Sequence, residues 1–207
     1  IEKKRTKPFF MTLAYYGVHI PTEAPQRLIK KHQKRRKQLK IAKGDSRYEV
    51  KIISDSTGEY KSVQNHVPYA AQVETIDESV GRLGSTLHQL GLEDNTLIVF
   101  TSDHGGFSSR STQYGGHLPA VNLPYRHGKG WLYDGGLRVP HIVKWPAKIN
   151  AGGKIKYQTS GVDHHATFLE ASGVEKYNFI DLDTVSYLKA VNGEEHTRGP
   201  IFWDSPL

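Results

Sequence analysis

The feature that most constrains the fold is an apolar run that ends abruptly in two polar residues and two glycines. Thr96–Phe100 is rich in Leu, Ile, Val and Phe, a composition that predicts a strand buried on both faces of a sheet between helices. Asp103, His104, Gly105 and Gly106 follow it closely. Ligands of such sheets bind beyond the carboxyl ends of the strands, so Asp103 and His104 are candidate metal ligands. An ordinary turn with a helix cap would explain the same residues.

A second apolar run, Pro8–Tyr16, predicts another buried strand. It is followed by His19, and Pro21 blocks continuation of the strand while restricting the residue before it. We therefore expect His19 to stand in a fixed loop at the same kind of strand end as Asp103.

The sequence between these two apolar runs predicts a helix. Apolar residues from His66 to Leu90 recur at alternating spacings of three and four, which indicates an amphipathic helix against a core, and Gly91 is its expected C-cap. Strand, long helix and strand in this order are typical of an α/β fold with parallel pairing. Further along, the sequence predicts a strand over Val139–Trp145, a helix over Val162–Ala171 capped by Gly173, and a last strand or the start of a smaller unit at Ile201–Trp203.

Much of the net charge of +7 is concentrated in one stretch of the chain. The cations from Arg27 to Lys43 lie in a stretch without an acidic residue. A helix with a narrow apolar side and a solvated basic face is one interpretation. Attraction to a polyanion, either a sulfated sugar or a nucleic acid, is the other. No nucleic-acid recognition motif accompanies the charge.

Length and composition limit the remaining classes of fold and of site chemistry. With 207 residues and 37% hydrophobic content, the chain can form one substantial core, and no apolar segment is long enough to span a membrane. The absence of cysteine excludes a disulfide framework, a thiolate zinc site and a cysteine nucleophile within these residues. Because the charged residues after Ile1 run straight into an apolar strand with no starting Met, we expect the sequence to be a piece of a longer protein.

A glycine-rich segment supplies a candidate anion ligand. Lys129 lies between Gly128 and Gly130, so it can approach an anion with little obstruction. An exposed loop lysine is the alternative. The long loop from Phe107 to Tyr125 lies before it, and loops of this length often carry substrate contacts.

The chain resembles the sulfatases, the formylglycine-using branch of the alkaline-phosphatase superfamily. Three segments carry the resemblance in the right order: Leu13–Tyr16 with His19 and Pro21, Ser102–Gly106, and Gly128–Gly130 with Tyr133–Pro140. Asp134 stands where the family signature usually has Glu. Related phosphodiesterases share the Asp-His-Gly motif, whereas the lysine and Gly-Gly-x-Arg-Val-Pro segments are more specific. The resemblance implies an α/β fold of the alkaline-phosphatase type, with a mixed, mostly parallel sheet sandwiched between helices.

The resemblance also implies residue roles in sulfate ester hydrolysis. Asp103 and His104 would be metal ligands, Lys129 would bind a sulfate oxygen, and His19 would contact or protonate the leaving group, a role that suits a histidine. Arg138 would support the loop structurally. Asn122, Arg126 and His127 are candidates for substrate contact.

The implied cofactors are a metal ion and formylglycine. Calcium is the expected ion, with magnesium and zinc as alternatives, and it would neutralise the sulfate oxygens. Calcium prefers oxygen ligands, so His104 could lie outside the first coordination shell or reach the sulfate instead, whereas zinc accepts imidazole readily. No Cys-x-Pro-x-Arg or Ser-x-Pro-x-Arg occurs in the sequence, so the nucleophile must come from the remainder of the same enzyme, and we expect this chain alone to hold half a site and to be inactive.

Two rival functions stay open. One is a phosphomonoester or phosphodiester hydrolase of the same superfamily, and the other is a non-catalytic module that binds sulfated polysaccharide. We expect residues 1–195 to form the C-terminal part of a catalytic domain and 196–207 to form its last strand or the start of a smaller subdomain. The expected substrate is a sulfated small molecule or polysaccharide, the expected partners include no nucleic acid, and the resemblance suggests export to the periplasm or location in the lysosome.

Overall fold

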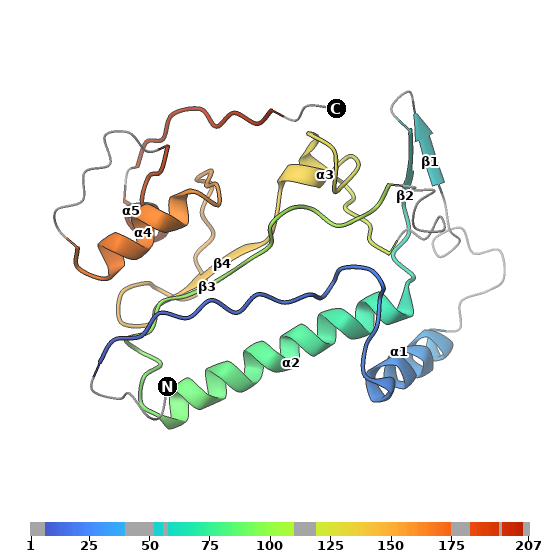
Figure 1. The fold of residues 1–207 in the computed structure, drawn as a ribbon, viewed down its shortest axis with the longest axis horizontal. Helices are drawn as coiled ribbons and strands as arrows, with labels where there is room; N and C mark the ends of the chain where they lie inside the picture. Colours follow the sequence, from blue (N-terminus) through green and yellow to red (C-terminus); the bar gives the residue numbers. More distant parts are fainter. Residues whose placement is uncertain are drawn as a thin grey trace. The chain divides into compact units, whose positions relative to one another are not determined.

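The computed structural model of the chain describes residues 7–39, 52–55, 58–109, 119–174, 183–194 and 196–204 (Figure 1). The chain divides into two compact units. Unit 1 comprises Ile1–Leu90 and His104–Arg138, and unit 2 comprises Gly91–Asp103 and Val139–Leu207. The boundary at 195 predicted from the sequence does not coincide with this division and stays a prediction.

A long helix, α2 (Val67–Gln89), is the main element of unit 1. The spacing of apolar residues predicted it, and Ala71 and Leu87 are almost fully buried on its inner face. The helix begins where the Nδ1 atom of His66 accepts a hydrogen bond from the Tyr69 amide, which satisfies one of the unpaired amides of the first turn. It ends before Gly91, whose φ of 65° confirms the expected glycine cap.

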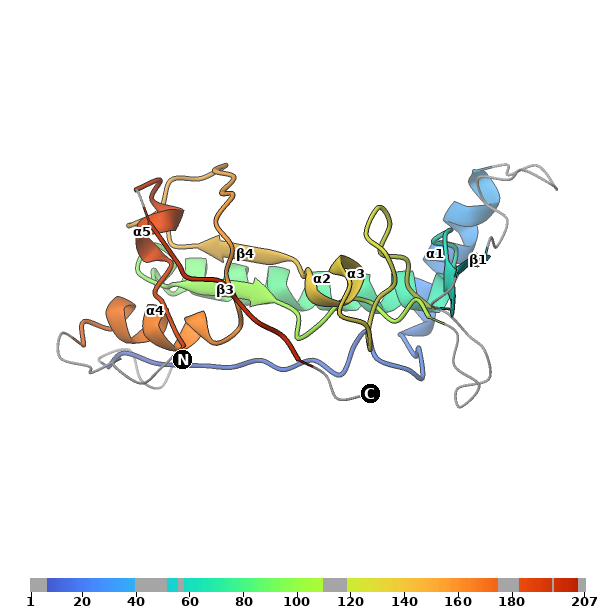
Figure 2. The same ribbon diagram turned by 90° about the horizontal axis from the view of Figure 1, so that it is seen from above.

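The basic stretch forms helix α1 (Gln26–Gln38), which lies beside the first half of α2 in both Figure 1 and Figure 2. Leu28 is its one buried residue and is 2% exposed. Arg27 pairs with Glu78, and Lys31 and His32 pair with Glu74, so the two helices run antiparallel. This confirms the predicted helix with a narrow apolar side, although residues 40–43 of the basic stretch lie outside the described residues.

Two short strands, β1 (Ile52–Asp55) and β2 (Gly58–Lys61), form an antiparallel pair in unit 1. Tyr60 bridges to Ser109, and the Lys61 amide donates to the Ser108 carbonyl over 3.0 Å. The pair thus connects a polar stretch of the chain with the loop that follows His104.

The prediction of a buried strand over Pro8–Tyr16 is wrong. The described residues of this segment are not in a strand, Phe10 is 75% exposed, and Tyr16 is 97% exposed. A strand needs the regular backbone ladder of a neighbouring strand, and none of the described strands pairs with this segment. Its end contacts α2 through a 3.0 Å hydrogen bond from the Tyr15 hydroxyl to Ser79.

Unit 2 contains strands β3 (Ile98–Thr101) and β4 (His141–Lys144). Both lie where the sequence predicted strands. They pair antiparallel, with Ile98 opposite Lys144 and Thr101 opposite His141, so the parallel pairing expected from the strand–helix–strand order is not found among the described strands. β3 is half-buried rather than enclosed on both faces.

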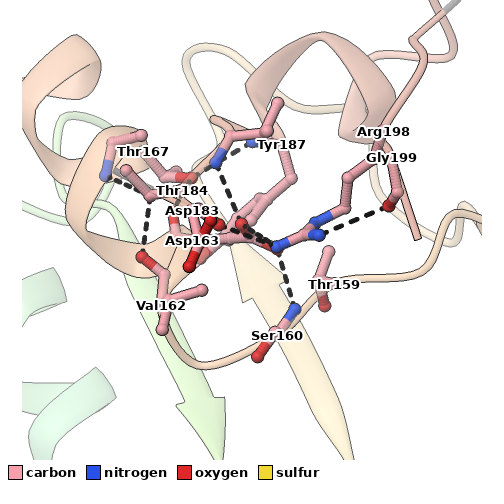
Figure 3. Close-up of polar contacts among 12 residues, drawn as sticks. Thr159, Ser160, Val162, Asp163, Thr167, Asp183, Thr184, Tyr187, Arg198 and Gly199 are labelled. Atoms are coloured by element: carbon pink, nitrogen blue, oxygen red, sulfur yellow. Dashed lines mark hydrogen bonds and ion pairs between the residues drawn. The ribbon is translucent and has the colours of Figure 1, made fainter. Parts of the chain in front are cut away.

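Helix α4 (Asp163–Ala171) confirms the helix predicted there, and Gly173 follows it with a φ of 78°. Asp163 is fully buried and makes two hydrogen bonds with Arg198, of 2.9 and 3.0 Å (Figure 3). The amides of Ser160 and Val185 also donate to this carboxylate. The cluster joins α4 to the chain around the short helix α5 (Leu188–Val191), whereas Ile201–Trp203 forms no strand.

None of the helices in the described ranges is long and apolar enough to cross a membrane.

Candidate functional site

Two of the predicted site residues meet in unit 1. The Nζ atom of Lys129 lies 3.2 Å from the Nε2 atom of His19, although 110 positions separate the two residues in the chain. His19 is exposed and Lys129 is half-buried. An anion placed beside this pair would therefore meet an ammonium group and an imidazole together.

The His19 ring is held from its other side. Its Nδ1 atom lies 2.6 Å from the carbonyl oxygen of Ile20, and a carbonyl can only accept, so Nδ1 carries the hydrogen and Nε2 has the lone pair that accepts from Lys129. The backbone is also fixed, because the side-chain amide of Gln72 on α2 donates to the His19 carbonyl over 3.4 Å.

Lys129 is placed by a direct contact between two glycine-rich segments. Its amide donates to the Gly106 carbonyl over 3.1 Å, and the Gly105 amide donates to the Gly136 carbonyl over 2.8 Å. A Cβ atom on Gly128 would lie 2.1 Å from the Gly106 oxygen, and one on Gly105 would lie 1.7 Å from the Gly135 oxygen. Two of the three segments that carry the family resemblance therefore pack backbone against backbone, which only glycine allows.

Asn122 holds the same two segments together. Its carboxamide oxygen accepts from the Gly106 amide over 3.0 Å, and its nitrogen lies 2.8 Å from the Gly106 carbonyl and 2.9 Å from the His127 carbonyl. It also lies 3.2 Å from the Ser108 hydroxyl. The amide thus bonds to the protein itself, which gives Asn122 a supporting position, and its predicted substrate contact stays a prediction.

His127 is buried, in contrast to its predicted substrate role. It is 1% exposed, and its ring lies 4.5 Å from that of Tyr60, 4.4 Å from that of Trp131 and 5.5 Å from that of Tyr133, measured between centroids. Its φ of 55° lies in the left-handed region, which ordinary side chains rarely adopt. The ring packs among aromatic side chains, and its Nδ1 atom lies 3.5 Å from the Ser109 hydroxyl, so the predicted substrate contact has no support here and stays a prediction.

The two arginines have different positions. The Arg126 guanidinium lies 4.2 Å from the centroid of the Tyr133 ring, half-buried, and stays a candidate for substrate contact. Arg138 lies 4.8 Å from the Tyr125 ring centroid and 3.5 Å from the Asp134 carboxylate, contacts of the kind that the predicted supporting role requires.

The candidate metal ligands lie just beyond β3, as predicted. Asp103 is exposed, and the Ser102 hydroxyl donates to its carboxylate over 3.3 Å. His104 is half-buried, and its Nδ1 atom lies 3.0 Å from the Gly105 carbonyl oxygen. Nδ1 must donate in this contact, which puts the lone pair of the ring on Nε2, the nitrogen that could serve as a ligand.

Asp103 and His104 fit only part of a metal shell. The residues with described placement contain no group of three or more His, Asp or Glu side chains that could hold a metal ion. One carboxylate suits calcium or magnesium, but six or more oxygens are needed to fill either shell. Any metal would need further ligands. The predicted convergence of Asp103 with Lys129 joins unit 2 to unit 1 and stays a prediction.

Sequence reasoning did not identify Gln72, Tyr60, Trp131 or Tyr133. Gln72 could have been recognised as a polar residue on the inner face of a periodic helix, next to Ala71. In the structure Gln72 is 7% exposed and Ala71 is fully buried. Among the aromatic residues around His127, Trp131 and Tyr133 lie in the same glycine-rich segment, whereas Tyr60 had no signal because it comes from a strand pair distant in the sequence.

Comparison with known proteins gives a consistent result. The family model described as Sulfatase matches residues 1–174. The chain is 37% identical to the steryl-sulfatase of Rattus norvegicus over 117 residues, which cover 56% of this chain and 20% of the relative. It is 27% identical to a sulfatase of Formosa agariphila over 217 residues, which cover 98% of this chain and 34% of the relative. The chain thus spans about a fifth to a third of these relatives.

Solved structures agree. The crystal structure of Ps i-CgsB in complex with k-i-k-neocarrahexaose matches with a TM-score of 0.67 and 28% identity, over 91% of this chain and 35% of that one. The putative sulfatase yidJ from Bacteroides fragilis matches with a TM-score of 0.63 and 24% identity, over 94% of this chain and 39% of that one. These neighbours have the α/β fold of the alkaline-phosphatase type, which confirms the fold class expected from the sequence.

Proposed function

The chain belongs to the sulfatase family, and from that membership we propose that the protein hydrolyses sulfate esters, with a sulfated carbohydrate as its substrate. The observation that supports this proposal is the pairing of His19 with Lys129 at 3.2 Å. One residue comes from the loop after Pro8–Tyr16 and the other from the glycine-rich segment, and each matches a family motif. Export to the periplasm or location in the lysosome remains the expectation for the compartment.

Lys129 is proposed to bind the sulfate group. Its ammonium group has three N–H donors. One points to the Nε2 atom of His19, and the other two have no acceptor among the described residues. An ammonium group held in this way can donate to sulfate oxygens and offset the charge that they carry as the ester bond breaks.

The His19 and Lys129 pair is also proposed to supply the proton for the departing alcohol. When the sulfur–oxygen bond breaks, the oxygen of the alcohol keeps the electron pair and needs a proton. Lys129 holds that proton at Nζ and transfers it to the oxygen of the alcohol, and the neutral amine regains a proton from water. His19, positioned by Ile20, orients the amine by accepting from it through Nε2. General acid catalysis of this type typically contributes about a hundredfold to ten-thousandfold to the rate.

Sulfatases generally use a metal ion and a formylglycine nucleophile, and Asp103 is the side chain best suited to hold the metal, with His104 beside it. When bound, such an ion neutralises charge on the sulfate oxygens. Calcium is the ion that we propose, with magnesium or zinc as alternatives. Neither Cys-x-Pro-x-Arg nor Ser-x-Pro-x-Arg is found in these 207 residues, so the nucleophile is proposed to lie elsewhere in the enzyme.

The test compares sulfate esters with good and poor leaving groups, using the intact enzyme and its Lys129→Ala and His19→Ala variants. We expect kcat for Lys129→Ala to fall by about a hundredfold to a thousandfold. The loss should be larger for an alkyl sulfate than for an aryl sulfate, because an alkoxide needs protonation more. The double variant should lose little more than Lys129→Ala, because coupled residues are not additive.

The matched control is Lys148→Ala, which removes an exposed lysine of unit 2 and should leave kcat unchanged. An equal loss for both classes of ester would refute the proton-donating role. More efficient hydrolysis of a phosphate monoester or diester than of any sulfate ester would favour the rival phosphohydrolase. Binding of sulfated polymer without any hydrolysis would favour the binding module.

A further inference from the structure

Three lysines of α1 lie on the side of the helix opposite its buried residue. Lys30, Lys34 and Lys37 are spaced four and three residues apart, so they share one face of the helix. At about 100° per residue, this face lies roughly opposite Leu28, which is 2% exposed. All three lysines are exposed. We call them the outer stripe.

Two of the three acidic residues of α2 pair with other cations of α1. Glu78 pairs with Arg27, and Glu74 pairs with Lys31 and His32. These pairs hold the pKa of both carboxyl groups below their usual value, mainly through the hydrogen bonds from Arg27 and Lys31. Within the described ranges, no acidic side chain pairs with the outer stripe, and α1 itself contains no acidic residue.

The positive charge extends beyond the stripe. Arg35 and Arg36 are exposed on the same helix. Lys61, at the end of β2, is 4% exposed. Burial lowers the pKa of Lys61, and the charge of Arg36 lowers it further. The field of α1 is therefore felt on a neighbouring element, and this part of unit 1 is a concentrated source of positive potential.

We propose that the outer stripe is a docking surface for a sulfated polysaccharide, separate from the residues that act on the ester. This inference rests on the proposed function for its choice of partner. The three lysines span about 10 Å of helix, enough to contact anionic groups on successive sugars of a chain. Charge complementarity supports a polyanion, and α1 contains no Phe, Tyr or Trp on which nucleic-acid bases could stack.

The test measures binding to heparin, a sulfated polysaccharide, over a range of salt concentrations. The variant Lys30→Gln/Lys34→Gln/Lys37→Gln, made in the intact enzyme, keeps good helix formers and removes the charge. We expect its affinity at low salt to fall by about tenfold or more. The slope of log affinity against log salt should become shallower by about two. Single variants at each position locate the effect and check that the melting temperature is unchanged.

The matched control, Lys148→Gln/Lys154→Gln/Lys189→Gln, removes the same charge from exposed positions of unit 2. It should bind heparin like the unaltered enzyme. An equal loss in both triple variants, or no loss in the stripe variant, overturns the proposal. Tighter stripe-dependent binding to single-stranded DNA than to heparin also overturns it, in favour of a nucleic-acid partner.

Hydrolysis of a small aryl sulfate is measured in parallel, and kcat should not change in the stripe variant. If stripe-dependent heparin binding is found in an enzyme that hydrolyses no sulfate ester, the docking surface stands and the proposed function fails. If the ester is hydrolysed but heparin binding is independent of the stripe, the proposed function stands and the docking surface fails.

Discussion

At the scale of single residues, the glycines around Lys129 are the positions that the structure constrains most. The two motif segments approach each other so closely that their carbonyl oxygens occupy the space of a missing Cβ, at 2.1 Å for Gly128 and 1.7 Å for Gly105. The obstacle at each position is backbone, which cannot rotate away as a side chain can. Glycine is needed here for close approach, and Lys129 depends on that approach for its position.

We therefore expect Gly128→Ala to lower the free energy of unfolding by about 2 to 3 kcal/mol, the cost of overpacking a tightly filled site. Denaturation by urea would measure it. The control is Gly81→Ala in α2, where a new Cβ would meet nothing within 4 Å. That substitution should stabilise the protein by up to about 1 kcal/mol, since alanine favours the helix. Equal stabilities of the two variants would contradict the contact between the segments.

The positions of the candidate site residues were partly predictable from the sequence. His19 and Lys129 were expected to act on one anion, and the structure brings them together. Asn122 and His127 were predicted as candidates for substrate contact. The structure shows that the first binds backbone groups and the second is enclosed by aromatic rings. Residue type and loop position do not distinguish a polar side chain that faces solvent from one that makes its contacts within the protein.

At the scale of elements, helices were more predictable than strands. The period of α2 and its glycine cap lie in the local sequence, and α4 was recognised in the same way. Pro8–Tyr16 has the composition of a buried strand, but a strand also needs a neighbour, which no local pattern encodes. The antiparallel pairing of β3 with β4 likewise depends on contacts between distant segments, so sequence order alone misled the expectation.

The contact between α1 and α2 shows which interaction holds two elements together. Leu28 is buried, whereas Arg27 is 61% exposed in its pair with Glu78. Exposed ion pairs contribute little and are screened by salt, so the apolar contact should dominate despite the number of charges.

Accordingly, Leu28→Ala should lower the free energy of unfolding by about 2 to 4 kcal/mol, and Arg27→Gln should lower it by much less. Chemical denaturation at low salt and in 1 M NaCl would separate the two. The effect of Leu28→Ala should persist at high salt, and that of Arg27→Gln should shrink. A larger loss for Arg27→Gln than for Leu28→Ala would show that charge, rather than burial, joins the helices.

At the scale of the whole molecule, the two units carry different titrating groups. In unit 2, burial lowers the pKa of His141 and His164, and the neighbouring imidazole lowers that of His141 further, while Asp163 partly offsets both shifts. Their rings lie 5.3 Å apart. For Asp163, burial would raise the pKa, but the hydrogen bonds from Arg198 and two amides hold it below its usual value. In unit 1, the pKa values of Glu74 and Glu78 are lowered from 4.5.

These directions set the sign of the pH dependence. Histidines with a lowered pKa in the folded state bind fewer protons than they do when unfolded, so stability rises with pH. Their contribution is fully present above the unfolded value near 6.5 and is lost as the pH falls through the folded values. The carboxyl groups whose pKa is lowered change the stability in the same direction, but only below about pH 4.5. Unit 2 should therefore lose stability first on mild acidification.

Tryptophan fluorescence can follow the two units separately, because Trp131 lies in unit 1 and Trp145 in unit 2. Using variants that retain one or the other, we expect the urea midpoint reported by Trp145 to fall between pH 7 and pH 5.5 and that reported by Trp131 to change less. His141→Asn can still bond to Thr159, which lies 3.1 Å from the ring nitrogen, but cannot titrate, so it should reduce the fall. A midpoint for Trp145 that is independent of pH, or a fall unaltered in His141→Asn, would show that the paired histidines do not set the acid sensitivity of unit 2.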